Sequence, residues 1–202
     1  KTKLGLFLTL NGVIYGVSRL VNGFLSDRIA NKKGLMALGL LLSAIVNILI
    51  GFIPDVNAFF TVLDTEGKAT MGFIYLMGSL WLINGWLQGM GYPPCSSLMA
   101  HWIRPSELAT KQSLWNASHS IGAGLLSLLI GAILGNFSNA AWQWCFWVPA
   151  ILAIFGAAMI FFGLRNEPHT VGLPSVEEID REYSGAAGEK KEEVAESPEL
   201  TR

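Results

Sequence analysis

The chain has 202 residues, of which 51% are hydrophobic and 14% charged, and its mean hydropathy is +0.44. These values exclude an ordinary soluble domain, because the apolar residues are gathered into runs of about 20, the length that spans a hydrocarbon core. The formal net charge is -1, and the basic residues lie mostly beside the ends of these runs, so nucleic-acid binding is not implied. Cys95 and Cys145 lack the number and spacing of a metal site or a disulfide framework.

Five apolar runs predict five transmembrane helices, at about residues 4–25, 35–53, 71–102, 108–134 and 141–164. The predicted fold class is therefore an all-α membrane protein, in which residues 1–164 form a transmembrane helical bundle. Residues 165–202 contain ten acidic and five basic residues. Their composition predicts a cytoplasmic segment that is largely disordered beyond about Tyr183.

Charged residues in the connections predict the orientation in the membrane. Arg28, Lys32 and Lys33 lie between the first two helices, and Arg104 and Lys111 lie near the start of the fourth. Basic connections stay on the cytoplasmic side, so both are expected there. The odd number of helices, with lysine rather than methionine as the first residue, predicts a fragment of a larger protein.

Six polar residues share one face of the first helix at about 100° per residue, namely Asn11, Tyr15, Ser18, Arg19, Asn22 and Ser26. An ionisable side chain about two turns inside a membrane is costly, and is a candidate functional residue for that reason. The alternative is that Arg19 is a long side chain that reaches the nearby interface. The polar neighbours on its face favour a binding role.

The third helix has a polar side of Trp81, Asn84, Gln88, Tyr92 and Cys95. Gly85, Gly89 and Gly91 lie beside it and predict close helix packing. Asn84 and Gln88 fit either a cavity or a packing role. Pro93 and Pro94 predict a bend, because proline removes a backbone donor and clashes with the preceding turn.

The fourth helix carries Gln112, Trp115, Asn116 and His119 on one side. Histidine can give or accept a proton near neutral pH, and it can hydrogen-bond a phosphate oxygen. A buried structural histidine is the alternative, but its polar neighbours favour a ligand or proton role for His119. The fifth helix is apolar from Cys145 to Leu164, so it is expected to face lipid together with the second helix.

Residues 23–33, GFLSDRIANKK, resemble the loop signature that joins transmembrane helices 2 and 3 in the major facilitator superfamily. In that family the charged residues of this loop form a network that latches one conformation. The resemblance assigns the conformational latch to Asp27, Arg28, Lys32 and Lys33.

Three further segments resemble the organophosphate:phosphate antiporter family of glycerol-3-phosphate and hexose-phosphate transporters, namely 85–95 (GWLQGMGYPPC), 114–119 (LWNASH) and 164–174 (LRNEPHTVGLP). The resemblance implies helices 2 to 6 of a twelve-helix protein of the bacterial inner membrane, with helix 1 and the C-terminal half missing. It implies exchange of a phosphorylated organic molecule for inorganic phosphate by alternating access, without a cofactor. The family also contains a membrane sensor of external hexose phosphate that signals to a histidine kinase, and this function is the alternative.

The resemblance also implies site residues. Arg19 matches a position that is usually lysine, and Tyr15, Trp115, Asn116 and His119 match pore-lining positions. With Asn84 and Gln88 from the third helix, these residues form the predicted substrate site. Leu108 and Ala109 replace an Arg-Gly pair of the family pattern, which leaves the subtype open. An enzyme is not expected, because the chain has no nucleophile and base set, no phosphate-cradling glycine loop and no metal-ligand spacing.

Overall fold

The computed structural model describes residues 2–60, 71–136 and 142–183, and these residues contain helices and no strand. The helices are α1 (Thr2–Arg28), α2 (Lys32–Phe60), α3 (Met71–Gly89), α4 (Tyr92–Trp102), α5 (Pro105–Asn136), α6 (Trp144–Gly163) and the short 3-10 helix η2 (Pro168–Val171), and residues 176–183 are also helical. The all-α prediction is therefore confirmed. The predicted disorder of residues 184–202 lies outside the described residues.

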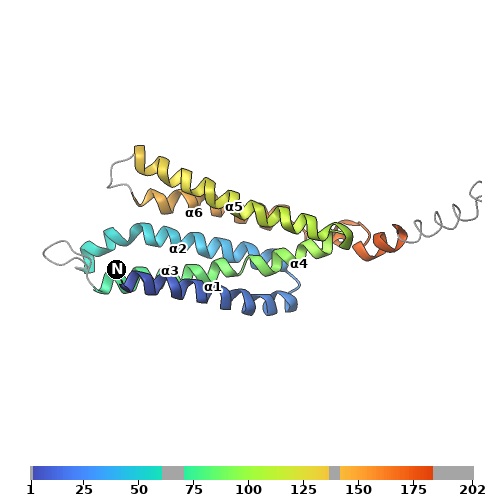
Figure 1. Ribbon diagram of the computed structural model, residues 1–202, viewed down its shortest axis with the longest axis horizontal. Helices are drawn as coiled ribbons and strands as arrows, with labels where there is room; N and C mark the ends of the chain where they lie inside the picture. The colour runs from blue at the N-terminus through green and yellow to red at the C-terminus, as the bar shows by residue number, and fades with distance from the viewer. Residues whose placement is uncertain (1, 61–70, 137–141, 184–202) are drawn as a thin grey trace, which may run out of the picture.

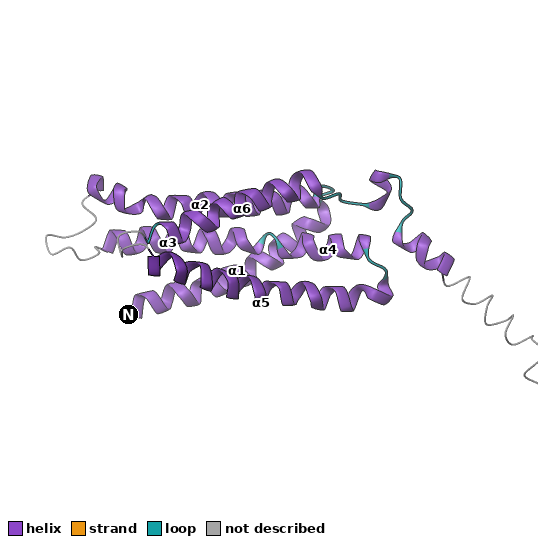
Figure 2. Cartoon of the chain, turned by 90° about the horizontal axis from the view of Figure 1, so that it is seen from above, coloured by secondary structure: helices purple, strands orange, loops and turns teal. Residues whose placement is uncertain are grey.

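The long helices run side by side along one axis, and the helical residues 176–183, in orange-red, lie beyond one end of the bundle (Figure 1). The most extensive packing is between α2 and α6 and between α1 and α3, whereas fewer residues of α5 contact its neighbours α4 and α6. Helices α3 and α4 follow each other along almost one line, with a short interruption between them (Figure 2).

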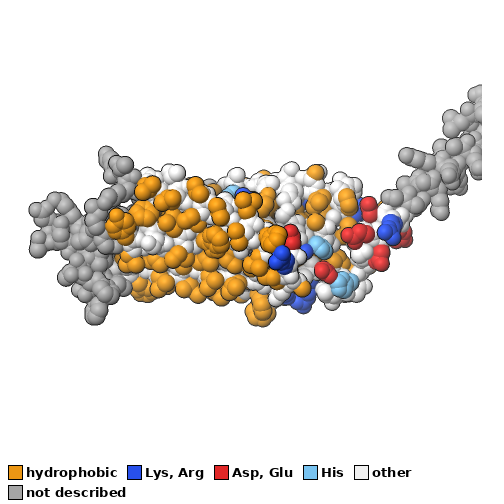
Figure 3. All heavy atoms as spheres, turned by 90° about the horizontal axis from the view of Figure 1, so that it is seen from below, with side chains coloured by type: hydrophobic (Ala, Val, Ile, Leu, Met, Phe, Trp, Pro, Cys, Tyr) orange, Lys and Arg blue, Asp and Glu red, His pale blue; other side chains and the backbone are white. Residues whose placement is uncertain are grey.

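Three described helices are long and apolar enough to cross a membrane, over Lys32–Ile53, Pro105–Gly135 and Trp144–Gly163. On the face that Figure 3 shows, hydrophobic side chains cover much of the bundle surface, and most charged side chains gather near one end. On α6 the large side chains of Phe155, Met159 and Phe162 point outward, each more than 60% exposed. This surface suits a multi-pass membrane protein, in which lipid covers the apolar faces.

The prediction of one continuous helix over residues 71–102 is wrong, because the chain breaks between α3 and α4 at Met90 and Gly91. Pro93 and Pro94 fall in the first turn of α4, where a helix lacks partners for its N–H groups anyway. Continuing α3 through them would leave the carbonyls of Gly89 and Met90 without donors and in contact with the proline rings. The predicted bend is therefore a full break.

Glycines allow α1 to approach α3 closely. A Cβ atom on Gly85 would collide with Oδ1 of Asn11, and one on Gly89 would lie 2.5 Å from Oγ of Ser18. Ser18 is fully buried, and its hydroxyl donates a 2.5 Å hydrogen bond to the Trp86 carbonyl. The packing role predicted for Gly85 and Gly89 is confirmed.

Candidate functional site

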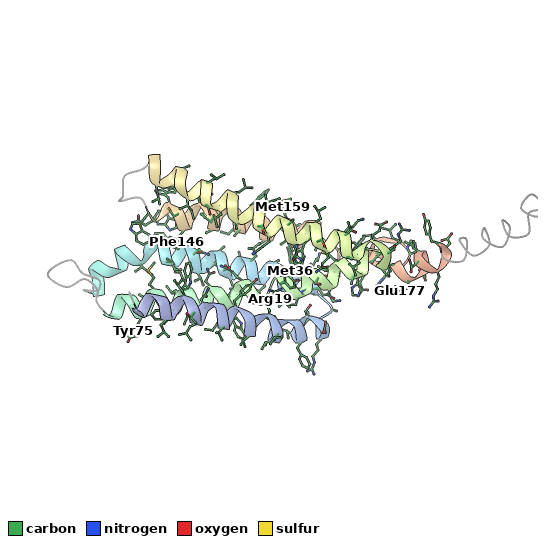
Figure 4. All side chains as sticks on the ribbon, in the orientation of Figure 1. Arg19, Met36, Tyr75, Phe146, Met159 and Glu177 are labelled. Atoms are coloured by element: carbon green, nitrogen blue, oxygen red, sulfur yellow. The ribbon has the colours of Figure 1, made fainter. Side chains whose placement is uncertain are left out.

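A pocket of about 240 Å³ lies between α1, α4 and α5. Its lining consists of Tyr15, Arg19, Tyr92, Trp115, Asn116 and His119. Five of these six residues were predicted to bind substrate, and the fold brings them together from segments about 100 residues apart in the chain. Arg19 lies inside the bundle, away from both of its ends (Figure 4).

Arg19 supplies the positive charge of the pocket. Its guanidinium carbon lies 3.6 Å from the centroid of the Tyr92 ring and 5.6 Å from that of Tyr15. Cation–π contacts hold the face of the guanidinium and leave its N–H groups for a ligand. Arg19 makes no ion pair with any carboxylate among the residues that the structure describes. Its charge is therefore available to an anion.

Tyr92 is the lining residue that the substrate-site prediction missed. Its ring stacks on Arg19 and also lies 4.9 Å from the Trp115 ring, at an angle of 45°. As the first residue of α4, it is positioned by the break at Gly91. The sequence did place Tyr92 on the polar side of its helix, together with Gln88. Because Gln88 was predicted to bind substrate, its position on the same side could have predicted Tyr92 as a lining residue.

His119 and Asn116 approach the pocket from α5. Both side chains are exposed, and neither makes a hydrogen bond to another described residue. His119 is thus not the buried, satisfied histidine that was the alternative. Histidine and asparagine each offer an N–H donor, so the two side chains can bind oxygen atoms of a ligand beside Arg19.

Asn84 and Gln88 do not line this pocket, but they line a neighbouring cavity of about 570 Å³. The two cavities share Tyr15, Tyr92, Trp115 and His119. Gln88 is exposed there, whereas Asn84 is only 4% exposed. Oδ1 of Asn84 accepts hydrogen bonds from Ser43 Oγ at 2.5 Å and Asn47 Nδ2 at 3.5 Å. This network joins α3 to α2, so the geometry gives Asn84 a packing contact and leaves Gln88 facing the cavity.

Some polar residues on the polar face of α1 line the pocket, and others pack inside the bundle. Ser18, Asn22 and Ser26 are at most 3% exposed, and Asn22 Nδ2 donates to the carbonyl and the hydroxyl of Ser18 at 2.8 and 2.9 Å. Of the six polar residues on this face, only Tyr15 and Arg19 line the small pocket. A polar residue on this face of α1 therefore does not by itself predict a pocket-lining residue, because half of the six are buried inside the bundle.

The four predicted latch residues lie where α1 ends and α2 begins. Lys32 Nζ donates to Ser97 Oγ on α4 at 2.7 Å, and Lys33 Nζ donates to the Phe161 carbonyl on α6 at 3.0 Å. The guanidinium of Arg28 lies over the Phe24 ring at 4.3 Å. Within the described residues no ion pair joins Asp27 to these bases. Instead the lysines connect α2 to two other helices.

A charge cluster holds the start of α5 at the same end. Arg104 contacts Glu107 at 2.5 Å, and Glu107 also contacts Lys111 at 2.9 Å. The hydrogen bond to Glu107 raises the pKa of Arg104 above its already high value, so Arg104 stays charged. Among the described residues no cluster of His, Cys, Asp and Glu side chains could hold a metal ion.

A family model described as Major Facilitator Superfamily matches residues 1–196. The chain therefore belongs to the Major Facilitator Superfamily, as the resemblance of residues 23–33 to its loop signature predicted.

The relatives narrow this class. The chain is 40% identical over 200 residues to the glycerol-3-phosphate transporter of Bacillus subtilis, which covers 99% of this chain and 41% of the relative. It is 32% identical over 202 residues to a probable hexose phosphate transport protein of Chlamydia pneumoniae, and this match covers 100% of the chain and 40% of the relative. It is 30% identical over 199 residues to the membrane sensor protein UhpC of Escherichia coli, and this match covers 95% of the chain and 40% of the relative. These relatives match the organophosphate:phosphate antiporter family, as predicted, and the chain spans about two fifths of their length.

Proposed function

We propose that this chain is part of a secondary transporter that exchanges glycerol 3-phosphate or a sugar phosphate for inorganic phosphate. The observation that carries the proposal is the unpaired Arg19 in a small pocket with the free donors of His119 and Asn116. A phosphate dianion needs a cation and several hydrogen-bond donors. The names of the relatives, which include glycerol-3-phosphate and hexose phosphate transporters, agree with this chemistry.

In this proposal the phosphate group binds to Arg19, His119 and Asn116. The rings of Tyr15, Tyr92 and Trp115 exclude water, which strengthens the attraction between Arg19 and the phosphate. The organic part of the substrate extends into the neighbouring cavity, where Gln88 is exposed. Asn84 supports the cavity wall through its bonds to α2.

Transport by alternating access requires a second bundle that closes over the site, and the relatives are long enough to contain one. We propose that Asp27, Arg28, Lys32 and Lys33 stabilise one of the two closed arrangements. The basic connections then face the cytoplasm of a bacterial inner membrane, together with residues 165–202.

Proteoliposomes that contain the complete protein and are loaded with phosphate test the proposal. External glycerol 3-phosphate or glucose 6-phosphate is expected to exchange for internal phosphate. Arg19→Ala and His119→Ala should each lower exchange at least tenfold, because each removes one charged or polar contact to the phosphate. Arg181→Ala, which removes a cation outside the bundle, is the matched control. Unchanged exchange in both pocket variants would contradict the site.

A sensor of external hexose phosphate is the second candidate, favoured by the 30% identity to UhpC. The same proteoliposomes separate the two functions. A sensor binds glucose 6-phosphate through Arg19 without exchanging it for phosphate. A transporter does both.

A further inference from the structure

A groove lies on the outer side of α2 and α6, away from the pocket of Arg19. It has a volume of about 530 Å³, and its lining includes Gly34, Ala37 and Leu41 of α2 and Ile154, Ala158 and Phe161 of α6. At about 100° per residue, Gly34 and Leu41 lie roughly opposite Met36 and Ser43, which face the inner cavity. The groove therefore opens toward the surroundings of the bundle.

Both helices that form this α2–α6 groove are long and apolar enough to cross a membrane. Along the groove, Leu38 and Phe162 are 48% and 74% exposed, whereas Ala37 and Ala157 beneath them are almost fully buried. Large side chains thus form the rims and small ones form the floor. Such a channel suits a flexible hydrocarbon chain.

One end of the α2–α6 groove is polar and basic. Asn31 lines it, and its Oδ1 accepts a hydrogen bond from Asn166 Nδ2 at 3.3 Å. The neighbouring Lys33 is held at the end of α6 by its bond to the Phe161 carbonyl, which uses one of its three N–H donors. Arg165, directly before Asn166, is exposed, whereas Lys33 is half-buried. Two cations therefore stand at the same end.

Trp102 indicates where this end lies relative to a membrane. Its side chain is 39% exposed, and its Nε1 donates to the Arg165 carbonyl at 3.1 Å. Tryptophan is enriched at membrane–water interfaces. The basic end is thus at the level of lipid headgroups, and the apolar floor continues toward the bilayer interior.

We infer that the α2–α6 groove binds an anionic phospholipid, with an acyl chain along the groove and the phosphate at Lys33 and Arg165. Basic pockets at the cytoplasmic ends of membrane helices favour anionic headgroups, by roughly fivefold for each lysine or arginine. The site is separate from the pocket of Arg19, so it stands whether the protein transports its substrate or senses it.

Native mass spectrometry of the protein purified from membranes can test this inference, with phosphatidylglycerol and phosphatidylcholine of identical acyl chains. Phosphatidylglycerol should bind more tightly, and Arg165→Gln should reduce the preference roughly fivefold. Lys33→Gln should do the same. Arg28→Gln removes a cation from the same end of the bundle, away from the groove, and should leave the preference unchanged. Equal binding of the two lipids to the wild type would overturn the inference.

A second variant tests the groove without altering its charge. Ala158→Phe should place a ring in the groove and reduce binding of both lipids, whereas Ala123→Phe, at an exposed position on α5, should not. A phosphatidylglycerol with a photoreactive acyl chain should label peptides that contain residues 34–41 and 154–162. Uniform labelling of all apolar helices would show that lipid has no specific site in the groove and would overturn the inference. A protein–protein adduct from a photoreactive side chain at position 158 would show that a protein occupies the groove and would also overturn it.

Discussion

The guanidinium of Arg19 stacks on the ring of Tyr92 at 3.6 Å, and this contact joins the middle of α1 to the first residue of α4. The position of the cation thus depends on where α4 begins. Because Gly91 and Pro93 determine that start, the break between α3 and α4 also orients the charge of the pocket.

Tyr92→Ala should weaken the binding of a phosphate ester roughly tenfold, because it removes the stacking partner of Arg19 and one wall of the pocket. Tyr92→Phe keeps the ring and should bind almost normally. Binding of glycerol 3-phosphate and glucose 6-phosphate by isothermal titration calorimetry gives the comparison.

Tyr183→Ala is a suitable control for this prediction. It removes a comparable contact, in which the Arg104 guanidinium lies 4.8 Å from the Tyr183 ring, outside the pocket. Affinity should not change. Equal losses in Tyr92→Ala and Tyr183→Ala would show that the effect does not come from the pocket.

Gly89→Ala should lower the free energy of unfolding by about 1–3 kcal/mol, because the new Cβ atom meets Ser18 and the Tyr15 backbone carbonyl at 2.5 and 3.2 Å. A backbone atom cannot rotate away. Thermal unfolding of the purified protein in detergent should therefore show a lower midpoint for this variant.

Gly124→Ala and Gly131→Ala provide the comparison on α5, where nothing lies within 4 Å of the added atom. These changes should be neutral or slightly stabilising, since alanine favours a helix over glycine. A midpoint for Gly89→Ala equal to that of the α5 variants would contradict the close contact between α1 and α3.

Asn84→Leu and Gln88→Leu should have different effects, although the sequence treats the two residues alike. Asn84→Leu leaves the buried hydroxyl of Ser43 without its acceptor and should destabilise the protein by about 1–3 kcal/mol. Gln88→Leu affects an exposed side chain and should change substrate affinity more than stability. Measuring both the unfolding midpoint and the binding constant for each variant separates these roles.

The sequence predicted the helices well because a membrane span leaves a strong local pattern. The hydrophobic runs predicted α1, α2, α5 and α6, and most of the predicted ends lie within a few residues of the observed ends. The break at Gly91 was harder to predict, because two prolines are compatible with either a kinked helix or two helices. Which of these forms depends on packing against α1, where Pro93 lies close to Gly23.

The candidate site was predicted only in part, for a related reason. Helical periodicity shows which residues share a face, but not whether that face meets a cavity or another helix. Arg19 and Ser18 are neighbours on one face, yet Arg19 lines a pocket while Ser18 is fully buried against α3. The resemblance to a family separated these two cases, whereas composition could not.

Asp27→Asn should leave the stability of the bundle unchanged while reducing exchange. In the described part of the chain Asp27 is exposed and makes no ion pair, so neutralising it removes no contact that holds these helices together. If Asp27 stabilises a closed arrangement with a second bundle, its loss shifts the population toward the other arrangement and slows turnover. Exchange in proteoliposomes and the unfolding midpoint in detergent should be measured on the same preparation. Asp180→Asn makes the same change beyond the bundle and should affect neither quantity. A lower midpoint for Asp27→Asn would assign Asp27 a structural role and contradict its function as a latch.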